Sequence, residues 1–398
     1  MSVAMGNQEH STYLARRQPY YVDGWFLFSA LSLLALGYVM VVSASLHLGE
    51  RVYTNITHYP LRQFVHIVLG LVMAFVLAKT PLSVWEKSGP SLILVALGLL
   101  VLVFIPGLGV KVNGSYRWVN LGVARVQVSE LVKFISVIYM AGFLTRHVDM
   151  VRKSILGVMK PVLPLGLVFG LLMLEPDFGA TFVIAFTVIC MMFLGGARLI
   201  EFLTLVLFGM VLGVVAIVSS PYRMERVMAF IDPWADPLDS GFQLVQSLIA
   251  MGRGEWLGVG LGSSIQKLFY LPEAHTDFIF AVLGEELGLL GSCSVILLFG
   301  LFVWRAFQMG KAAERLNLRF YSLMAYGLGV WVGLQAFVNI AVNMGALPTK
   351  GLTLPLMSYG GSSMVVMCMV VGLLCRINHE TKLDHENQIK RSGPWQYA

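Results

Sequence analysis

A short polar segment with an aspartate precedes one of the long apolar stretches of the chain. Residues 271–280 read Leu-Pro-Glu-Ala-His-Thr-Asp-Phe-Ile-Phe, so Asp277 is expected at the N-terminus of a helix. Asp is a common helix cap, and the helix dipole stabilises a carboxylate there. A carboxylate at a membrane surface can also accept a proton from a substrate hydroxyl. From the residues alone, the cap and the general base are equally good interpretations.

Two further carboxylates follow on the same expected helix. Glu285 and Glu286 come eight and nine residues after Asp277, about 12 Å farther along a helix that rises 1.5 Å per residue. Charges within an apolar helix are costly and are usually functional or paired. We therefore expect this helix to face the interior of a helix bundle.

A carboxylate and an amine lie close together farther upstream. Glu130 and Lys133 are three residues apart in Gln-Val-Ser-Glu-Leu-Val-Lys, which places both side chains on one face of a helix. The two residues form a structural ion pair, or Lys133 is a cation near the outer mouth of a cavity, where it can bind an anionic headgroup. The sequence leaves both alternatives open.

Cations also occur in loops and near helix ends on the same expected side of the membrane. Arg117 and Trp118 lie in the loop 107–128, where they are either an interfacial aromatic anchor or a site for phosphate and sugar. Arg223, Arg226 and Lys350 are the other cations near helix ends.

A dense cluster of small and polar residues interrupts the last apolar stretch. It includes Tyr359 and Ser362 within Ser-Tyr-Gly-Gly-Ser-Ser, residues 358–363. Small residues permit close helix packing. A cluster this dense is more typical of an irregular stretch that lines a cavity.

The elements that must position these residues are membrane helices. The 398 residues are 57% hydrophobic and only 13% charged, with a mean hydropathy of +0.76, whereas soluble domains carry about 25% charged residues. We predict an all-α polytopic membrane protein of ten helices, since ten apolar stretches approach the length needed to span a bilayer. They lie near residues 24–46, 62–79, 89–106, 129–145, 161–175, 178–196, 199–219, 277–304, 320–341 and 352–375.

The distribution of basic residues predicts the orientation. Most of the 28 Lys and Arg residues fall in segments on the same side of the membrane as residues 1–23. The positive-inside rule therefore predicts that the N-terminal tail, 1–23, and the C-terminal tail, 377–398, are cytoplasmic. The domain between them spans 24–376. Its large outer loop, 220–276, contains prolines, glycines and aromatic residues, and we expect it to fold into short interfacial helices.

Other classes of function find no support in the sequence. The net charge of +6 is not arranged as a basic stripe with interleaved aromatics, so nucleic-acid binding is not expected. The four cysteines lie in apolar stretches and are expected to pack as buried thiols. No nucleotide-binding or zinc spacing occurs. Any reaction must therefore draw its energy from the substrate or from a gradient.

Several of these segments together resemble the SEDS family of bacterial membrane glycosyltransferases. The resemblance spans residues 20–377. Proline-Glu-Ala-His at 272–275 and Pro-Thr-Lys-Gly at 348–351 favour the division branch over elongation proteins such as RodA. One departure is Gln-Val-Ser-Glu at 127–130, where the family usually has Gln-Pro-Ser-Glu. The motifs that carry the resemblance are residues 221–227, 232–237, 241–247, 272–280 and 358–363.

The resemblance implies polymerisation of lipid II into glycan strands at the outer face of the cytoplasmic membrane. Asp277 would be the general base of a single inverting displacement, with undecaprenyl pyrophosphate leaving. Cations would stabilise the leaving group, and a divalent cation, Mg²⁺ or Mn²⁺, is a further candidate. The candidate substrate-binding residues are Lys133, Arg117, Trp118, Arg125, Arg223, Lys350, Tyr359, Ser362, Glu130 and His275.

Competing functions are a lipid II flippase, an elongation enzyme of the RodA type and a scaffold that only recruits division proteins. The resemblance also implies partners at the division septum. These are a class B penicillin-binding protein, the transpeptidase FtsI, and the FtsQ-FtsL-FtsB complex.

Overall fold

The computed structural model describes residues 20–112, 115–120, 122, 125–153 and 155–391. The predicted N-terminal tail up to residue 19, with Arg16 and Arg17, lies outside the described residues, as do residues 392–398 of the predicted C-terminal tail.

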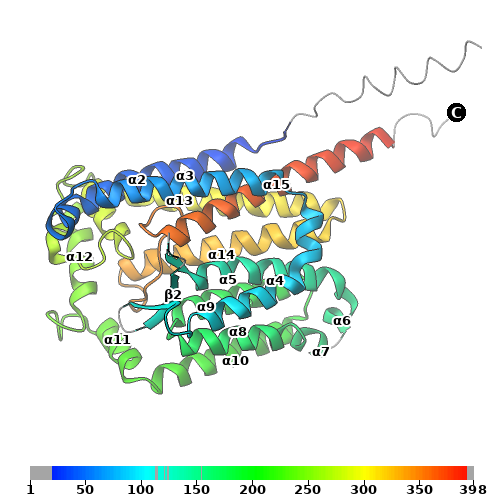
Figure 1. Cartoon of the computed structure of the whole chain (residues 1–398), viewed down its shortest axis with the longest axis horizontal. Coiled ribbons are helices and arrows are strands. Elements are labelled where there is room, and N and C mark those ends of the chain that lie inside the picture. The colour runs from blue at the N-terminus through cyan, green and yellow to red at the C-terminus, as the bar shows by residue number, and fades with distance from the viewer. Residues whose placement is uncertain (1–19, 113–114, 121, 123–124, 154, 392–398) are drawn as a thin grey trace, which may run out of the picture.

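Long α-helices make up most of the described chain and lie side by side in one bundle (Figure 1). In chain order, the helices are α2 (Gly24–Tyr53), α3 (His58–Lys79), α4 (Leu82–Leu102), α5 (Val128–Arg146), α6 (Val148–Lys153), α7 (Ile155–Met159), α8 (Val162–Leu174), α9 (Phe178–Leu194), α10 (Leu199–Val218), α11 (Pro221–Ile231), α12 (Phe242–Gly254), the π-helix η1 (Gln266–Tyr270), α13 (Ile279–Arg315), α14 (Arg319–Asn343) and α15 (Gly361–Arg391).

The predicted polytopic membrane fold is confirmed. Within the described residues, nine helical segments have the length and hydropathy of a membrane span. The apolar helix α9 has 17 residues and falls short of that length. The predicted count of ten therefore stays a prediction, because it requires α9 to cross the bilayer.

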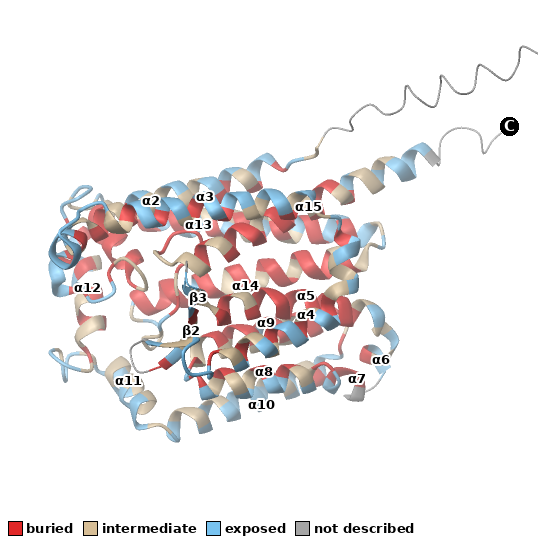
Figure 2. Ribbon diagram, viewed as in Figure 1, coloured by how far each residue is buried: buried red, intermediate tan, exposed pale blue. Residues whose placement is uncertain are grey.

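Burial separates the centre of the bundle from its periphery (Figure 2). In α5, almost every side chain from Val128 to Leu144 is buried, and α14 packs against both α5 and α13. On the periphery, α10 buries only Glu201 among its residues. An apolar helix with this little protein contact is expected to face lipid, so polar groups on α5 and α14 are the ones enclosed by protein.

A small β-sheet occupies the loop 107–128, and the prediction of an all-α chain missed it. Strands β1 (Gly109–Val112), β2 (Ser115–Asn120) and β3 (Arg125–Gln127) form an antiparallel sheet in the order β1-β2-β3. Aromatic and β-branched residues favour strands, but segments of three to six residues carry little periodicity. The last strand leads directly into α5.

Several of the predicted helix boundaries differ from the structure, most clearly in α15. The last helix, α15, begins at Gly361 rather than near 352, and residues 352–360 are irregular, as the small polar cluster indicated. It also continues through Arg391, so the described part of the predicted C-terminal tail is helical. Helix α13 is interrupted at Gly288, whose φ of 65° only glycine adopts readily.

The large outer loop is folded, as predicted. It contains α11, α12 and η1, which lie at one end of the bundle, while α6 and α7 lie at the opposite end (Figure 1). Chemistry that involves the loop is therefore confined to one end of the molecule.

Candidate active site

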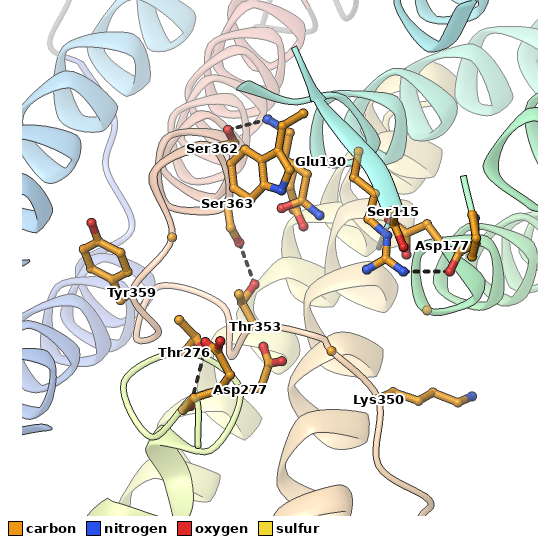
Figure 3. A pocket seen from close by; sticks show the side chains of 18 of the residues that line it. Ser115, Glu130, Asp177, Thr276, Asp277, Lys350, Thr353, Tyr359, Ser362 and Ser363 are labelled. Atoms are coloured by element: carbon orange, nitrogen blue, oxygen red, sulfur yellow. Dashed lines mark hydrogen bonds between the residues drawn. The ribbon is translucent and has the colours of Figure 1, made fainter. Parts of the chain in front are cut away.

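A large cavity opens at the end of the bundle that carries the outer loop. Its volume is about 1550 Å³, at or above the size of most small-molecule sites. The sheet, α11, the segment before α13 and the irregular segment before α15 all contribute to its walls. Asp277 lies in this cavity, between Tyr359 and Lys350 in the view of Figure 3.

Two asparagines on α14 fix the backbone of Asp277. Asn339 and Asn343 both donate from Nδ2 to the Asp277 carbonyl, at 2.8 and 3.0 Å. The spacing of four residues places both amides on one face of α14. The Oδ1 atom of Asn343 also accepts from the Ala281 amide at 3.0 Å, in the first turn of α13.

The two preceding carbonyls are held by the segment before α15. The Tyr359 amide donates to the His275 carbonyl at 2.9 Å, and the Ser358 hydroxyl donates to the Thr276 carbonyl at 2.6 Å. Three successive carbonyls, 275–277, thus have separate donors. Hydrogen bonds to three successive carbonyls fix the backbone and so preorganise the Asp277 side chain for chemistry.

The Asp277 carboxylate itself receives no hydrogen bond or ion pair from the described residues. Burial raises its pKa to about 7, with a further increase from the nearby Glu273, while Arg226 and Arg117 oppose the shift. A helix cap would accept backbone hydrogen bonds, and none is made. The geometry therefore favours the general-base interpretation over the cap.

The cavity is rich in cations that lack carboxylate partners. No salt bridge among the described residues involves any of the six that line it, which are Arg62, Arg117, Arg125, Arg223, Arg226 and Lys350. Unpaired cations in a cavity are suited to an anionic ligand. Burial lowers the pKa of Lys350 to about 8.

Several of these cations are held by aromatic rings and carbonyls. The Lys350 ammonium lies 4.7 Å from the Phe178 ring centre and 4.6 Å from that of Phe182. Arg223 donates to the Ala216 carbonyl at 2.8 Å, and Arg117 donates to the Pro176 carbonyl at 2.7 Å. These contacts orient the cations and leave their charge uncompensated.

Most of the predicted substrate-binding residues line this cavity. They are Arg117, Trp118, Arg125, Glu130, Arg223, Lys350, Tyr359 and Ser362. The Ser362 hydroxyl also accepts from the Gln127 amide at 2.8 Å and so joins the sheet to α15. His275 is absent from the lining, and its ring packs 5.0 Å from Tyr59 and 5.3 Å from Tyr359.

Lys133 also does not line the cavity. Its amine is bound to Glu130 at 2.9 Å and to Gln335 at 2.8 Å, and the residue is 2% exposed. The structure favours the structural ion pair, with Glu130 between Lys133 and the cavity. The second Glu130 oxygen, Oε2, has no hydrogen-bond partner in the part of the chain that the structure describes.

Glu285 and Glu286 are fully buried and paired, as their position in an apolar helix indicated. Arg253 contacts Glu285 at 2.8 Å, and Lys267 contacts Glu286 at 2.7 Å. Both cations belong to the outer loop, and neither carboxylate lines the large cavity. These pairs fasten the loop to α13.

The sequence interpretation missed four residues of the site. Arg62 lies in the second turn of the apolar helix α3, and its charge there was the available signal. Glu273 and the pair Asn339 and Asn343 carried weaker signals. Two amides four residues apart in an apolar helix indicate a buried hydrogen-bonding site.

The described residues contain no group of three or more His, Cys, Asp or Glu side chains arranged to hold a metal ion. Mg²⁺ is often held by one or two carboxylates together with substrate phosphates. The carboxylates that line the cavity are Glu130, Asp177, Glu273 and Asp277, and such a shared ion would bind among them.

Comparisons with known proteins agree with this arrangement. The chain is 55% identical over 361 residues to the protein named probable peptidoglycan glycosyltransferase FtsW from Methylococcus capsulatus, covering 91% of both chains. It resembles a chain solved in a study of polymerisation and crosslinking by a peptidoglycan synthase complex, with a TM-score of 0.73, 30% identity and coverage of 90% and 98%. It also resembles the rod shape determining protein RodA of Thermus thermophilus, with a TM-score of 0.68, 26% identity and coverage of 90% and 97%.

The family model for the cell cycle proteins FtsW, RodA and SpoVE matches residues 24–383. That range includes the whole cavity and every helix that positions Asp277. The chain therefore belongs to the FtsW/RodA/SpoVE family of cell cycle proteins.

Proposed function

We propose that this protein is a peptidoglycan glycosyltransferase that polymerises lipid II during cell division. The observation that carries the proposal is the Asp277 carboxylate, which has no partner among the described residues and is held by its backbone in a cavity whose cations form no salt bridge with them. Similarity to a relative named FtsW, at 55% identity, supports the division role over the elongation role of RodA, at 26%.

Asp277 is proposed to act as general base. The acceptor sugar hydroxyl transfers its proton to the Asp277 carboxylate while its oxygen attacks the anomeric carbon of the donor. The bond from that carbon to undecaprenyl pyrophosphate breaks in the same displacement. An α-linked donor thereby gives a β-linked product by one inversion, and cleavage of the bond between the sugar and the pyrophosphate supplies the energy.

The leaving pyrophosphate requires positive charge on one side of Asp277. Lys350, Arg223 and Arg117 approach that side of the cavity from different elements, without carboxylate partners. Oriented cations in a site of restricted solvent access stabilise negative charge that develops during a reaction. A divalent cation, Mg²⁺ or Mn²⁺, held by the other carboxylates of the cavity together with the pyrophosphate, would supply further charge neutralisation.

A lipid II flippase would need a path to the opposite end of the bundle. Beneath the cavity, α5 is almost wholly buried, and Trp331 and Ile138 fill the space between helices. Close packing of this kind favours chemistry at one face over transport across the bundle.

The two functions differ in their need for a sealed membrane. We expect the purified protein, with its transpeptidase partner, to convert lipid II to glycan in detergent, where no sidedness exists. Movement of lipid II in sealed vesicles, with no glycan made in detergent, would contradict the proposal.

The proposed setting is the bacterial inner membrane at the septum, with both termini cytoplasmic. The proposed partners are a class B penicillin-binding protein of the FtsI type and the FtsQ-FtsL-FtsB complex. Similarity to a chain studied within a peptidoglycan synthase complex supports the first partner. Co-purification with FtsI from division-stage cells, compared with an elongation transpeptidase, tests the assignment.

A further inference from the structure

One wall of the cavity is built from aromatic rings, and the proposed mechanism leaves it unused. This aromatic wall consists of Tyr53, Tyr59, His66, His275 and Tyr359. The Tyr59 ring lies at its centre, 5.8 Å from Tyr53, 5.0 Å from His275 and 5.3 Å from Tyr359, measured between ring centres. His66 joins it through Tyr359 at 6.4 Å.

The wall has a layer that faces the cavity and a layer behind it. Tyr53, His66 and Tyr359 line the cavity, and Tyr59 and His275 support them from behind. Tyr53 remains 46% exposed. Rings that serve only to pack the core would be covered, whereas these present surface to whatever enters the cavity.

Local backbone features keep the wall in place. A side chain at residue 361 would put its Cβ 2.7 Å from the His66 Nε2 atom, so Gly361 provides the space that the imidazole needs. The Nδ1 atom of the same ring is buried without a partner. Tyr359 is fixed by its amide, which donates to the His275 carbonyl at 2.9 Å.

The wall lies on the other side of Asp277 from the cations that are proposed to hold the leaving group. Figure 3 shows Tyr359 and Lys350 on opposite sides of the carboxylate. His275 is only two residues from Asp277, and its carbonyl ties Tyr359 to the same segment. A ligand lying on this wall would therefore present its edge to Asp277.

The chemistry of the wall suits a sugar. Aromatic rings offer flat apolar faces with polar atoms at their edges, and binding sites combine such faces with a few polar groups that fix orientation. A pyranose ring has an apolar C–H face and a rim of hydroxyls. The Tyr53 and Tyr359 side chains and Arg62 line the cavity at the wall and provide partners for that rim.

We propose that the aromatic wall is the binding site for the acceptor sugar, with an N-acetylated sugar ring stacked on Tyr359 and its attacking hydroxyl directed to Asp277. The proposal rests on the proposed function. It assigns the two halves of the cavity to different parts of the reaction, with sugar on the aromatic side and pyrophosphate on the cationic side.

The test compares ring loss with hydroxyl loss at one position. Tyr359→Leu removes the ring, and we expect KM for lipid II to rise about tenfold, the scale of one lost ring contact, with shorter glycan strands and little change in kcat. Tyr359→Phe keeps the ring and should restore KM and strand length most of the way. Tyr116→Leu, an exposed tyrosine of β2 outside the cavity, is the matched control.

Unchanged KM and strand length in Tyr359→Leu, or equal damage in both Tyr359 variants, would overturn the assignment. If Tyr359→Leu does not fold, as judged by thermal unfolding in detergent, Tyr53→Leu provides the same comparison.

A second measurement does not depend on turnover. Saturation-transfer NMR on the Asp277→Asn protein, with a soluble lipid-free oligomer of N-acetylglucosamine and N-acetylmuramic acid, should show contact between aromatic protons and the sugar ring, lost in Tyr359→Leu. If the wild type polymerises lipid II but no contact between aromatic protons and the sugar ring is seen, the aromatic site is refuted and the proposed function stands. A wild type that makes no glycan refutes the proposed function instead.

Discussion

Asp277 and the pair Glu285 and Glu286 lie within ten residues of one another at the start of α13, yet their surroundings differ completely. Asp277 is half-buried in the cavity, and none of the residues that the structure describes donates to its carboxylate. Glu285 and Glu286 are fully buried, with Arg253 and Lys267 as partners. The Ser43 hydroxyl donates to Glu286 as well, at 2.7 Å.

The difference in surroundings separates a carboxylate suited to catalysis, Asp277, from two with a structural role, Glu285 and Glu286. A buried carboxylate with a cation and several donors is fixed in place by those contacts and joins the elements that carry them. A carboxylate that is desolvated without a partner has its pKa brought toward neutrality, where it can. Acidic residues in one helix segment therefore take opposite roles according to the groups around them.

The largest effect is expected from Asp277→Asn. The amide keeps the shape but cannot accept a proton, so the polymerisation rate should fall about a thousandfold, within the range for loss of a general base. Initial rates of glycan formation from lipid II provide the measurement. The melting temperature should stay close to that of the wild type, because the backbone carbonyl, not the carboxylate, makes the structural contacts.

The opposite result is expected at the buried pair. Lys267→Met removes the cation that pairs with the buried Glu286, which should cost about 3–5 kcal/mol of stability. Unfolding in detergent would measure this loss of stability. The polymerisation rate of the folded fraction should fall far less than that of Asp277→Asn. The double variant Lys267→Met, Glu286→Gln should recover much of the stability. If the single variant kept full stability and lost activity, the division between chemistry and architecture would fail.

Loss of a cavity cation should have a smaller effect than loss of the base. Lys350→Met removes a charge proposed to face the leaving pyrophosphate, and we expect about a hundredfold lower kcat, the scale for one electrostatic contact in a transition state. Lys111→Met, at an exposed lysine of β1 outside the cavity, is the control. Equal rates for the two variants would remove Lys350 from the reaction.

The smallest effect concerns the position of the carboxylate. A Cβ at Gly351 would lie 3.2 Å from Asp277 Oδ2, so Gly351→Ala should displace the carboxylate by a few tenths of an ångström and slow the reaction about tenfold, since small misplacements are costly. Kinetics of the purified variant test this. Gly166→Ala, where a Cβ meets nothing within 4 Å, should leave the rate unchanged.

The helices were predictable because a membrane helix is recognisable in the sequence as a long apolar stretch. The sheet of the loop 107–128 was not, since its strands of four, six and three residues are too short to show alternation. The start of α15 was misplaced because Leu352 to Met357 is apolar although irregular. Its backbone is held by side chains from other elements, as when Asn339 donates to the Leu352 carbonyl at 2.6 Å.

The site was predictable in composition but less so in arrangement. Sequence reasoning selected Asp277 and the cations at helix ends because charges are rare in this chain. It could not decide between the two interpretations of Lys133, since the decisive partner, Gln335, is 202 residues away. The asparagines that hold Asp277 were missed for the same reason. Long-range contacts of this kind leave no local pattern.

The pH dependence of polymerisation tests the central claim most directly. Because burial raises the pKa of Asp277 to about 7 from an ordinary value of 3.8, the carboxyl is protonated and inactive below pH 7 and gains the ability to accept a proton above it. The rate should rise through pH 7, and then fall above about pH 8 as Lys350 loses its charge. The rise should be missing from the residual activity of Asp277→Asn. A rise with the same midpoint in that variant would show that another group is the base.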